Sequence, residues 1–405
     1  MSIVTNLQVP GVLEVRSMRE EERERFRLMT SQSFNLPRHR AALHAATPLD
    51  EAWVLAMGSD IQGALRAETV GQFFGGRSVS SVALSAVQIM PQGRGRGFGT
   101  ILMNRVMSEL RDRGVALSVL YPTKTGFYRS LGYEIAGAYT RYQLPILAAP
   151  RESRLPVVEA FEDDGFDLIA ACYQRLGESS CGLLDRSARW WNTRVLTGAE
   201  DRPLYRYLVR NEDGEVTGYV IYSHEPEPSG FDYSYSLVCQ DLVWHDRESA
   251  QALLSFAGSH LVVGVNLSWA GSVEEPLAQL MHIQQPQIQQ ASSWMVRLLN
   301  VPKAIEGRGY PLSLNETIDL TVTDAALPTN AGSIRIEVCD GVAKVSPIDS
   351  AAAVVDVGAL AAIYTGWLPA RESVRMGGLK SASVAEVEIL EKMFVSPRPW
   401  CMDRF

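Results

Sequence analysis

One segment of the sequence narrows the possible folds more than any other: a β-like run that leads through a glycine- and arginine-rich loop into an amphipathic helix. Residues 78–90 (SVSSVALSAVQIM) form the strongest β-pattern in the first third of the chain and end at Pro91. The loop 92–99 follows, and apolar residues at helical spacing then fill 100–113, up to Gly114. This order of elements predicts an α/β unit with a strand, a loop and a helix in succession.

The residue types of this loop suit the binding of a pyrophosphate. Glycines let backbone N–H groups turn towards one point and approach the ligand closely, and the helix N-terminus adds a partial positive charge. Arg94 and Arg96 add full charges. The alternative is a tight strand-to-helix connection without a ligand. The R-x-x-G-x-G register, the preceding V-x-I-x-P strand and the downstream segment 127–134 (FYRSLGYE) favour a binding site.

Together these three features resemble the GNAT superfamily of acetyltransferases. The resemblance implies acetyl-CoA as the acetyl donor and no metal. Main-chain amides of the loop would hold the coenzyme A pyrophosphate, and the preceding strand would pair with the pantetheine arm. The residues expected at the cofactor on this basis are Val87, Gln88, Ile89, Arg94, Gly95, Arg96, Gly97, Phe98, Gly99, Thr100, Thr123 and Lys124.

Tyr128 stands where many GNAT enzymes keep a tyrosine near the thioester sulfur. The ordinary pKa of a phenol, about 10, lies above that of a thiol, so the phenol stays protonated until a departing thiolate needs its proton. The resemblance therefore assigns Tyr128 the role of general acid. The alternative is that Tyr128, between Phe127 and Leu131, only packs in the core.

The whole chain resembles the Eis (enhanced intracellular survival) family of bacterial N-acetyltransferases in its length of 405 residues, in segment 127–134 and in its aromatic C-terminus 400–405 (WCMDRF). About three domains fit this length. The resemblance implies a mixed α+β and α/β fold: a GNAT domain over 1–150, a second GNAT-like domain without a phosphate loop over 151–285, and a sterol-carrier-protein-like domain over 286–405. The Gln-rich tract 284–290 is interpreted as the linker before the last domain. A homo-hexamer is implied as well.

In the Eis family the C-terminal carboxylate reaches the active site and acts as general base, which would give that role to Phe405. Chain ends are usually frayed and solvated, and that is the alternative here. Family members acetylate amines of aminoglycosides and can also modify lysine side chains. Two other functions stay open: a dedicated protein-lysine acetyltransferase, and a non-catalytic protein that senses acetyl-CoA or binds lipid.

Composition restricts the partners. The net charge of −8 argues against nucleic acid and anionic membranes and is compatible with a cationic amine substrate. The five cysteines lack CxxC spacing and the six histidines lack metal-ligand spacing, so no zinc site is expected. No export signal is visible, which favours the bacterial cytoplasm. A further hypothesis is that residues 20–22 (EEE) and Asp403 line an acidic entrance.

Overall fold

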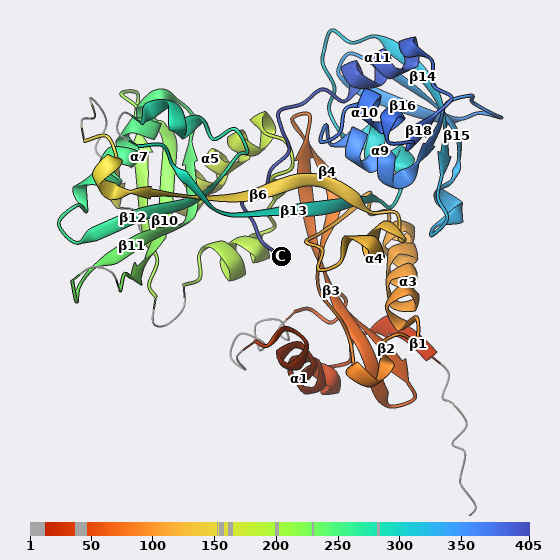
Figure 1. Ribbon diagram of the computed structural model, residues 1–405, viewed down its shortest axis with the longest axis horizontal. Coiled ribbons are helices and arrows are strands. Elements are labelled where there is room, and N and C mark those ends of the chain that lie inside the picture. The colour runs from red at the N-terminus through yellow and green to blue at the C-terminus, as the bar shows by residue number, and fades with distance from the viewer. Residues whose placement is uncertain are drawn as a thin grey trace, which may run out of the picture.

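The structure is a computed structural model that describes residues 13–36, 47–151, 153, 158–160, 165–198, 202–228, 231–281 and 284–405. Two sheets organise these residues, one of 13 strands and one of five. Figure 1 shows three lobes, with the first and second parts of the chain joined along the large sheet and the last part, in blue, carrying the small one.

The first part of the chain folds largely as its pattern predicted. The turn residues 58–60 between strand patterns at 51–57 and 61–69 predict an antiparallel hairpin, and β2 and β3 form it around Gly58, whose φ is 64°. The apolar stripe of helix α3 is buried against the sheet. Its elements are β1 (Leu13–Ser17), η1 (Glu20–Glu22), α1 (Arg23–Phe34), β2 (Ala52–Met57), β3 (Asp60–Phe74), β4 (Arg77–Ile89), η2 (Pro91–Gly93), α3 (Phe98–Asp112), β5 (Leu117–Leu120), α4 (Thr125–Arg129) and β6 (Glu134–Pro145).

The second part repeats the succession of antiparallel strands, crossover helix and parallel strand. Its sequence pattern predicts helices over 165–176 and 249–260 and strands over 205–209, 215–223 and 233–244, which are present as α5, α7, β9, β10 and β11. The pattern does not predict β12 or the short helices, because they carry too few periodic positions. Its elements are η3 (Ile146–Ala148), β7 (Val158–Ala160), α5 (Phe166–Ser179), β8 (Leu184–Asp185), α6 (Ala188–Trp190), η5 (Trp191–Val195), β9 (Tyr205–Arg210), β10 (Val216–Pro226), β11 (Tyr235–Trp244), α7 (Arg247–Ser259), β12 (Gly264–Gly271) and η6 (Pro276–Leu280).

The Gln-rich tract is not a linker, and that prediction is wrong. It opens strand β13 (Gln287–Leu298), which pairs antiparallel with both β5 and β6 and thereby lies inside the sheet of the first part. In Figure 1, β13 and β6 run side by side from the second lobe into the first. Gly137 makes this pairing possible, because a Cβ there would lie 1.9 Å from Cζ2 of Trp294, its cross-strand partner.

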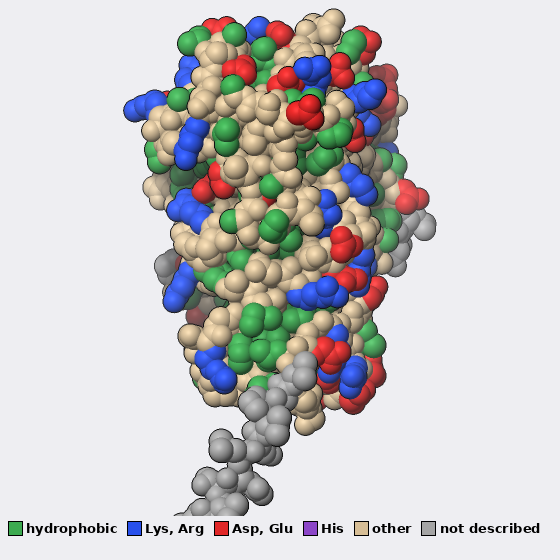
Figure 2. Space-filling model, turned by 90° about the vertical axis from the view of Figure 1, so that its right-hand side faces the viewer, with side chains coloured by type: hydrophobic (Ala, Val, Ile, Leu, Met, Phe, Trp, Pro, Cys, Tyr) green, Lys and Arg blue, Asp and Glu red, His purple; other side chains and the backbone are tan. Residues whose placement is uncertain are grey.

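The last part is an α+β unit around the five-stranded sheet, in the strand order β16-β15-β14-β17-β18. Helix α9 packs on β6 and β13 of the large sheet. On the face drawn in Figure 2, basic and acidic side chains are intermixed. The elements are α8 (Val301–Gly307), β14 (Glu316–Thr323), η7 (Pro328–Asn330), β15 (Gly332–Cys339), β16 (Val342–Pro347), β17 (Val354–Asp356), α9 (Val357–Tyr364), α10 (Ala370–Arg375), β18 (Leu379–Lys380) and α11 (Val384–Met393).

In both halves of the large sheet, two parallel strands pair over a short stretch and then separate. In the first, a bulge shifts the register of β4 against β3 opposite Ala64 and Arg66, and β4 pairs in parallel with β5 only over Ser81–Ala83. In the second, a bulge shifts β11 against β10, and β11 pairs with β12 only as far as Val238. Beyond these points the parallel strands diverge. Each half of the large sheet therefore holds one cleft between its parallel strands.

Within the residues that the structure describes, no helix is long and apolar enough to cross a membrane.

Candidate active site

The first cleft, about 470 Å³ in volume, lies where β4 and β5 diverge. The end of β4, the glycine loop, the start of α3 and helix α4 supply its walls. Every residue predicted at the cofactor lines it except Gln88 and Arg96, and the lining also includes Gly93, Phe127 and Tyr128. The sequence therefore identified the segments that line this cleft. The roles of the individual residues stay predictions.

The two predicted residues outside the lining have identifiable reasons. Gln88 alternates with Val87 and Ile89 along the strand, so its side chain faces the other side of the sheet, where its amide donates to Thr30 Oγ1 at 2.9 Å. The Arg96 guanidinium lies over the ring of Phe98, 4.8 Å from its centroid. Neither side chain contributes to the wall of the cleft.

The glycine loop leaves the start of α3 open to a ligand. Gly95 and Gly97 have φ values of 76° and 77°, and a Cβ at either would meet no atom within 4 Å. Gly97 is the N-cap of α3, and no side chain caps the helix. The first N–H groups of α3 are therefore donors for an anion, and the helix dipole favours negative charge there. Arg94 and Lys124 line the same cleft and add two cationic side chains.

Tyr128 lies in the wall of this cleft and is almost fully buried, with 6% of its surface exposed. Its ring packs edge-on against Phe127 and Tyr133, with centroid distances of 5.1 and 5.8 Å. Burial raises the pKa of Tyr128 to about 12. The phenol is thus protonated at neutral pH and can act chemically as a proton donor.

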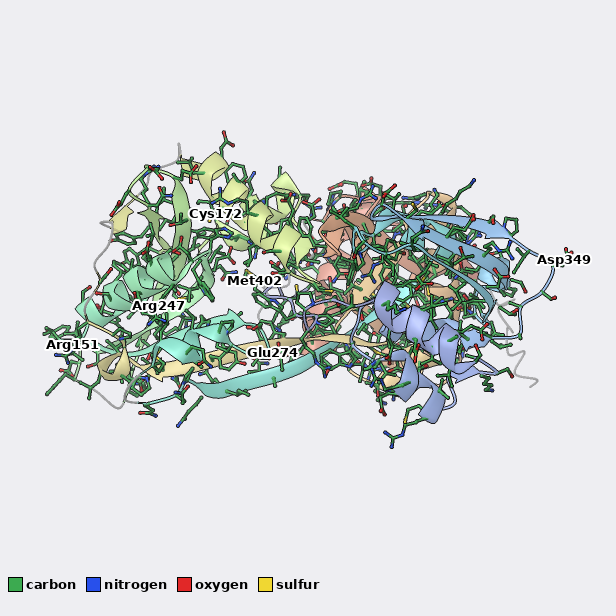
Figure 3. All side chains as sticks on the ribbon, turned by 90° about the horizontal axis from the view of Figure 1, so that it is seen from above. Arg151, Cys172, Arg247, Glu274, Asp349 and Met402 are labelled. Atoms are coloured by element: carbon green, nitrogen blue, oxygen red, sulfur yellow. The ribbon has the colours of Figure 1, made fainter. Side chains whose placement is uncertain are left out.

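The C-terminal segment returns from the last domain to the large sheet. Ala138 of β6 donates its N–H to Pro399 and accepts from the N–H of Cys401, at 3.1 and 2.9 Å. Trp400 donates its N–H to the carbonyl of Cys181 at 2.9 Å. Figure 1 marks the C-terminus, and Figure 3 labels Met402, between the two halves of the large sheet. The end of the chain is thus held by backbone pairing.

A buried ion triad fixes this segment. The Arg186 guanidinium donates from Nε to both carboxylate oxygens of Asp403, each at 3.0 Å, and from its two terminal nitrogens to Asp241 at 2.6 and 2.9 Å. Trp190 Nε1 donates to Asp403 at 2.9 Å. Burial lowers the pKa of Arg186, but the two carboxylates outweigh it and the net pKa lies above its ordinary value. The hypothesis that Asp403 lines an open acidic entrance is wrong, because Asp403 is only 7% exposed and is neutralised by Arg186.

The last residue lies beside the end of β5. The Phe405 ring packs 4.8 Å from the ring of Tyr121 and 6.2 Å from that of Trp190. The Tyr121 hydroxyl donates to the carbonyl of Asp403 at 2.8 Å. Tyr121 directly follows β5, and two residues later Thr123 enters the lining of the first cleft. One short stretch of chain therefore contacts both the C-terminal segment and the cleft.

Comparisons with known proteins agree with this architecture. Family models for the acetyltransferase (GNAT) domain match residues 14–136 and 182–298, and a model for the sterol carrier protein domain matches residues 301–402. The order of these three matches confirms the predicted fold class of two GNAT-like domains followed by a sterol-carrier-protein-like domain.

Relatives extend over much of the chain. An uncharacterized N-acetyltransferase of Streptomyces avermitilis is 29% identical over 65% of this chain and 66% of its own length, just under two thirds. Another, from Streptomyces coelicolor, is 26% identical over 76% and 79% of the two chains. The crystal structure of a GCN5-related N-acetyltransferase from Anabaena variabilis matches with a TM-score of 0.91 and 26% identity, over 97% of this chain and 100% of that one. Eis1 from Mycobacterium abscessus shares the fold, with a TM-score of 0.78 and 22% identity over 97% and 100%.

Replacement of Arg186 by methionine tests the triad. Arg186→Met leaves Asp241 and Asp403 buried without their cation, and we expect the free energy of unfolding to fall by about 3–5 kcal/mol in urea denaturation. The matched control is Arg202→Met, because Arg202 pairs with Glu225 at an exposed site, where such a pair contributes at most about 1 kcal/mol. Equal losses in the two variants would contradict a stabilising role of the triad.

Proposed function

Because the chain is a member of the GNAT superfamily of N-acetyltransferases and shares the three-domain fold of the Eis family, we propose that it acetylates primary amines of multi-amine substrates such as aminoglycosides. The acetyl group comes from acetyl-CoA. The proposal has three parts: the first cleft takes the donor, the carboxylate of Phe405 takes a proton from the acceptor ammonium, and Tyr128 gives a proton to the departing thiolate.

The observation that carries the proposal is that the stretch 121–124, which follows β5, contacts the C-terminal segment at one end and lines the first cleft at the other. Tyr121 holds the Asp403 carbonyl and packs on Phe405, while Thr123 and Lys124 line the cleft. A terminal carboxylate is a poor candidate for chemistry when the chain end is frayed. Here backbone pairing at Ala138 and the Arg186 triad restrain the end. That restraint supports a positioned base rather than a solvated tail.

The first cleft fits the donor in its shape and in its charges. Uncapped N–H groups at the start of α3, open space beside Gly95 and Gly97, and the cations Arg94 and Lys124 suit a pyrophosphate. Beyond Ala83 the edge of β4 that faces β5 is unpaired, and Val87 and Ile89 line the cleft along it. This edge supplies backbone groups for the amides of a pantetheine arm and an N–H near Ile89 that can polarise the thioester carbonyl.

Protons move in two places during this direct transfer. The acceptor ammonium gives its proton to the Phe405 carboxylate, whose ordinary pKa of about 3.5 keeps it ionised at neutral pH. The amine nitrogen then forms the new bond to the acetyl carbon, and the carbon–sulfur bond breaks. The Tyr128 phenol, with a pKa raised by burial to about 12, protonates the thiolate. The acetylated nitrogen loses its second proton, which returns through solvent to the Tyr128 phenolate, and the products are an amide and coenzyme A with a free thiol.

Two features support the acceptor class. The net charge of −8 favours the approach of a polycation, and acceptors with several amines are the substrates that the Eis resemblance implies. We include assembly into a homo-hexamer in this proposal, because the resemblance to the Eis family implies it.

The direct test measures coenzyme A release from acetyl-CoA by the untagged protein with aminoglycosides, polyamines and lysine peptides as acceptors. We expect turnover with several aminoglycosides, because a restrained carboxylate beside an open cleft can accept protons from differently placed amines. Turnover with lysine peptides alone would replace the proposal with a protein-lysine acetyltransferase. Tight acetyl-CoA binding without turnover on any acceptor would favour the sensing or lipid-binding alternative.

Replacement of Tyr128 by phenylalanine removes only the hydroxyl. We expect kcat to fall about 100-fold while the Kd of acetyl-CoA is unchanged, since the ring keeps its packing. The phenol is active when protonated, so with a pKa of about 12 it causes no loss of wild-type kcat as the pH rises from 7 to 10. Tyr235→Phe, whose hydroxyl contacts His260 far from the first cleft, is the control. Wild-type kcat in Tyr128→Phe would remove Tyr128 from the mechanism.

Two changes at the last residue separate the carboxylate from the ring. Addition of Gly-Gly after Phe405 keeps the ring and displaces the charge, and we expect kcat to fall at least about 100-fold. Phe405→Ala keeps a carboxylate at position 405 and removes the contact with Tyr121, and a smaller loss is expected. Both proteins should bind acetyl-CoA normally in calorimetry. An extended protein with full turnover would exclude the terminal carboxylate as the base.

A further inference from the structure

The second half of the large sheet contains a cleft of its own, about 280 Å³ in volume. It lies where β11 and β12 diverge beyond Val238, the position that matches the first cleft between β4 and β5. Three tryptophans, Trp244, Trp269 and Trp400, contribute to its lining together with a carboxyl side chain, Glu275. The proposed acetyl transfer uses none of these side chains.

The second cleft does not suit a pyrophosphate. Helix α7 starts beside it, but its N-cap is an acid: Asp246 accepts from the N–H of Ser249 at 2.6 Å, and Ser249 bonds back to the N–H of Asp246. The amides that an anion would need are thus already partly satisfied by a negative side chain, in contrast to the uncapped Gly97 of α3. Together with Glu275, the acidic cap favours a cationic ligand over an anionic one.

Glu275 is held in this cleft at a conformational cost. It is 5% exposed, and its backbone has φ 27° and ψ 85°, a left-handed conformation that is unfavourable for a residue with a side chain. Its carboxyl oxygens accept from Trp269 Nε1 and from the N–H of Leu277, each at 3.0 Å. Position 271 must be glycine for this arrangement, because a Cβ at Gly271 would lie 1.8 Å from Glu275 Oε2.

No cation of the described residues forms an ion pair with the carboxyl group of Glu275. Burial raises its pKa to about 7 from the ordinary 4.5, against the lowering effect of the two hydrogen bonds. A buried acid with this pKa is half ionised near neutral pH and gains most from a positive charge brought next to it.

We propose that the second cleft binds a small organic cation, a protonated or quaternary amine, with its charge against the Glu275 carboxylate and its apolar groups against the tryptophans. Tryptophan faces attract such cations, and a desolvated site strengthens the attraction. The ligand would contact Trp400 and therefore the segment that ends at Phe405. The binding step does not depend on acetyl transfer.

Two described groups near Glu275, Tyr142 and His245, are not expected to change charge on binding, so the expected titration is that of Glu275. Tyr142 of β6 donates its hydroxyl to the carbonyls of Ser272 and Val273, and burial raises its pKa to about 12, so it stays neutral. His245 shares the cleft and binds the carbonyl of Cys172 through Nε2 at 2.9 Å. Burial lowers the pKa of His245 from its ordinary 6.5, against the raising effect of the hydrogen bond to Cys172, which favours the neutral imidazole at pH 7.

Glu274 is the exposed neighbour of Glu275 and is labelled in Figure 3. It serves as the matched control because the same substitution there leaves the buried carboxyl unchanged.

The test uses benzyltrimethylammonium, a quaternary amine without an N–H bond to acetylate, and titrates it into the full-length protein by calorimetry with saturating coenzyme A. Only the ionised form of Glu275 binds the cation well, so affinity rises as the pH rises through 7. With a pKa of about 7, Kd should be roughly tenfold lower at pH 8 than at pH 6. Glu274→Gln should show the same pH dependence.

Two variants decide the outcome. Glu275→Gln should bind at least roughly tenfold more weakly than wild type at pH 8 and show no change between pH 6 and pH 8. Trp244→Leu leaves Glu275 in place and should also weaken binding, which guards against misfolding of the glutamine variant. Retained coenzyme A affinity shows that each variant is folded. Wild-type affinity in both variants, a pH-independent wild-type Kd, or no binding at millimolar concentration would overturn the proposal.

Discussion

The ion triad of Arg186 with Asp241 and Asp403 is the interaction on which the placement of the chain end depends. A buried guanidinium with two carboxylates is stable only when every donor and acceptor is satisfied, and here both carboxylates receive hydrogen bonds from Arg186 and Asp403 also from Trp190. Asp241 lies on β11 of the second half of the large sheet, and Arg186 directly follows β8, a short strand that pairs with β3 of the first half. Arg186 and Trp190, from the second part of the chain, thus hold Asp403, two residues before Phe405.

The two halves of the large sheet have the same arrangement of strands and crossover helix but different residues at the start of that helix. Each half has a bulged strand, a crossover helix and a parallel strand that diverges. The difference lies at the helix start: Gly97 leaves the α3 amides open, whereas Asp246 covers those of α7 with a carboxylate. The two proposed ligands differ in sign of charge in the same direction as these two helix starts.

The sequence predicts those helices and strands whose hydrophobic period and turn residues lie within about 15 consecutive residues. The strand–loop–helix unit, the hairpin around Gly58 and three strands of the last domain could be predicted because period and turn residues agree over each segment. The patterns of those three strands lie at 318–322, 332–338 and 341–345 and match β14, β15 and β16. Strand alternation alone would have separated Gln88 from Val87 and Ile89, since side chains two residues apart share a face.

What could not be predicted depends on contacts between distant residues. The Gln-rich start of β13 has few strand-forming side chains, and only its pairing with β6 makes it a strand. Arg186 and Asp403 are 217 residues apart, and neither has a neighbour that indicates a buried pair. The stacking of Arg96 on Phe98 likewise follows from the path of the folded loop. For the candidate site, the sequence indicated its segments, and the fold determined which side chains face the cleft.

The insertion of β13 between β5 and β6 has a consequence for the order of folding during synthesis. Leu117 of β5 pairs with Leu298, so the central strands of the first half keep open edges until nearly three quarters of the chain has been made. Open β-edges invite pairing with other chains, and domains usually fold as they emerge from the ribosome. The sheet of the first half cannot be completed while only the residues of the first half have been synthesised. Its completion must wait for a strand that follows the whole second part in the chain, which couples the folding of the two halves of the large sheet.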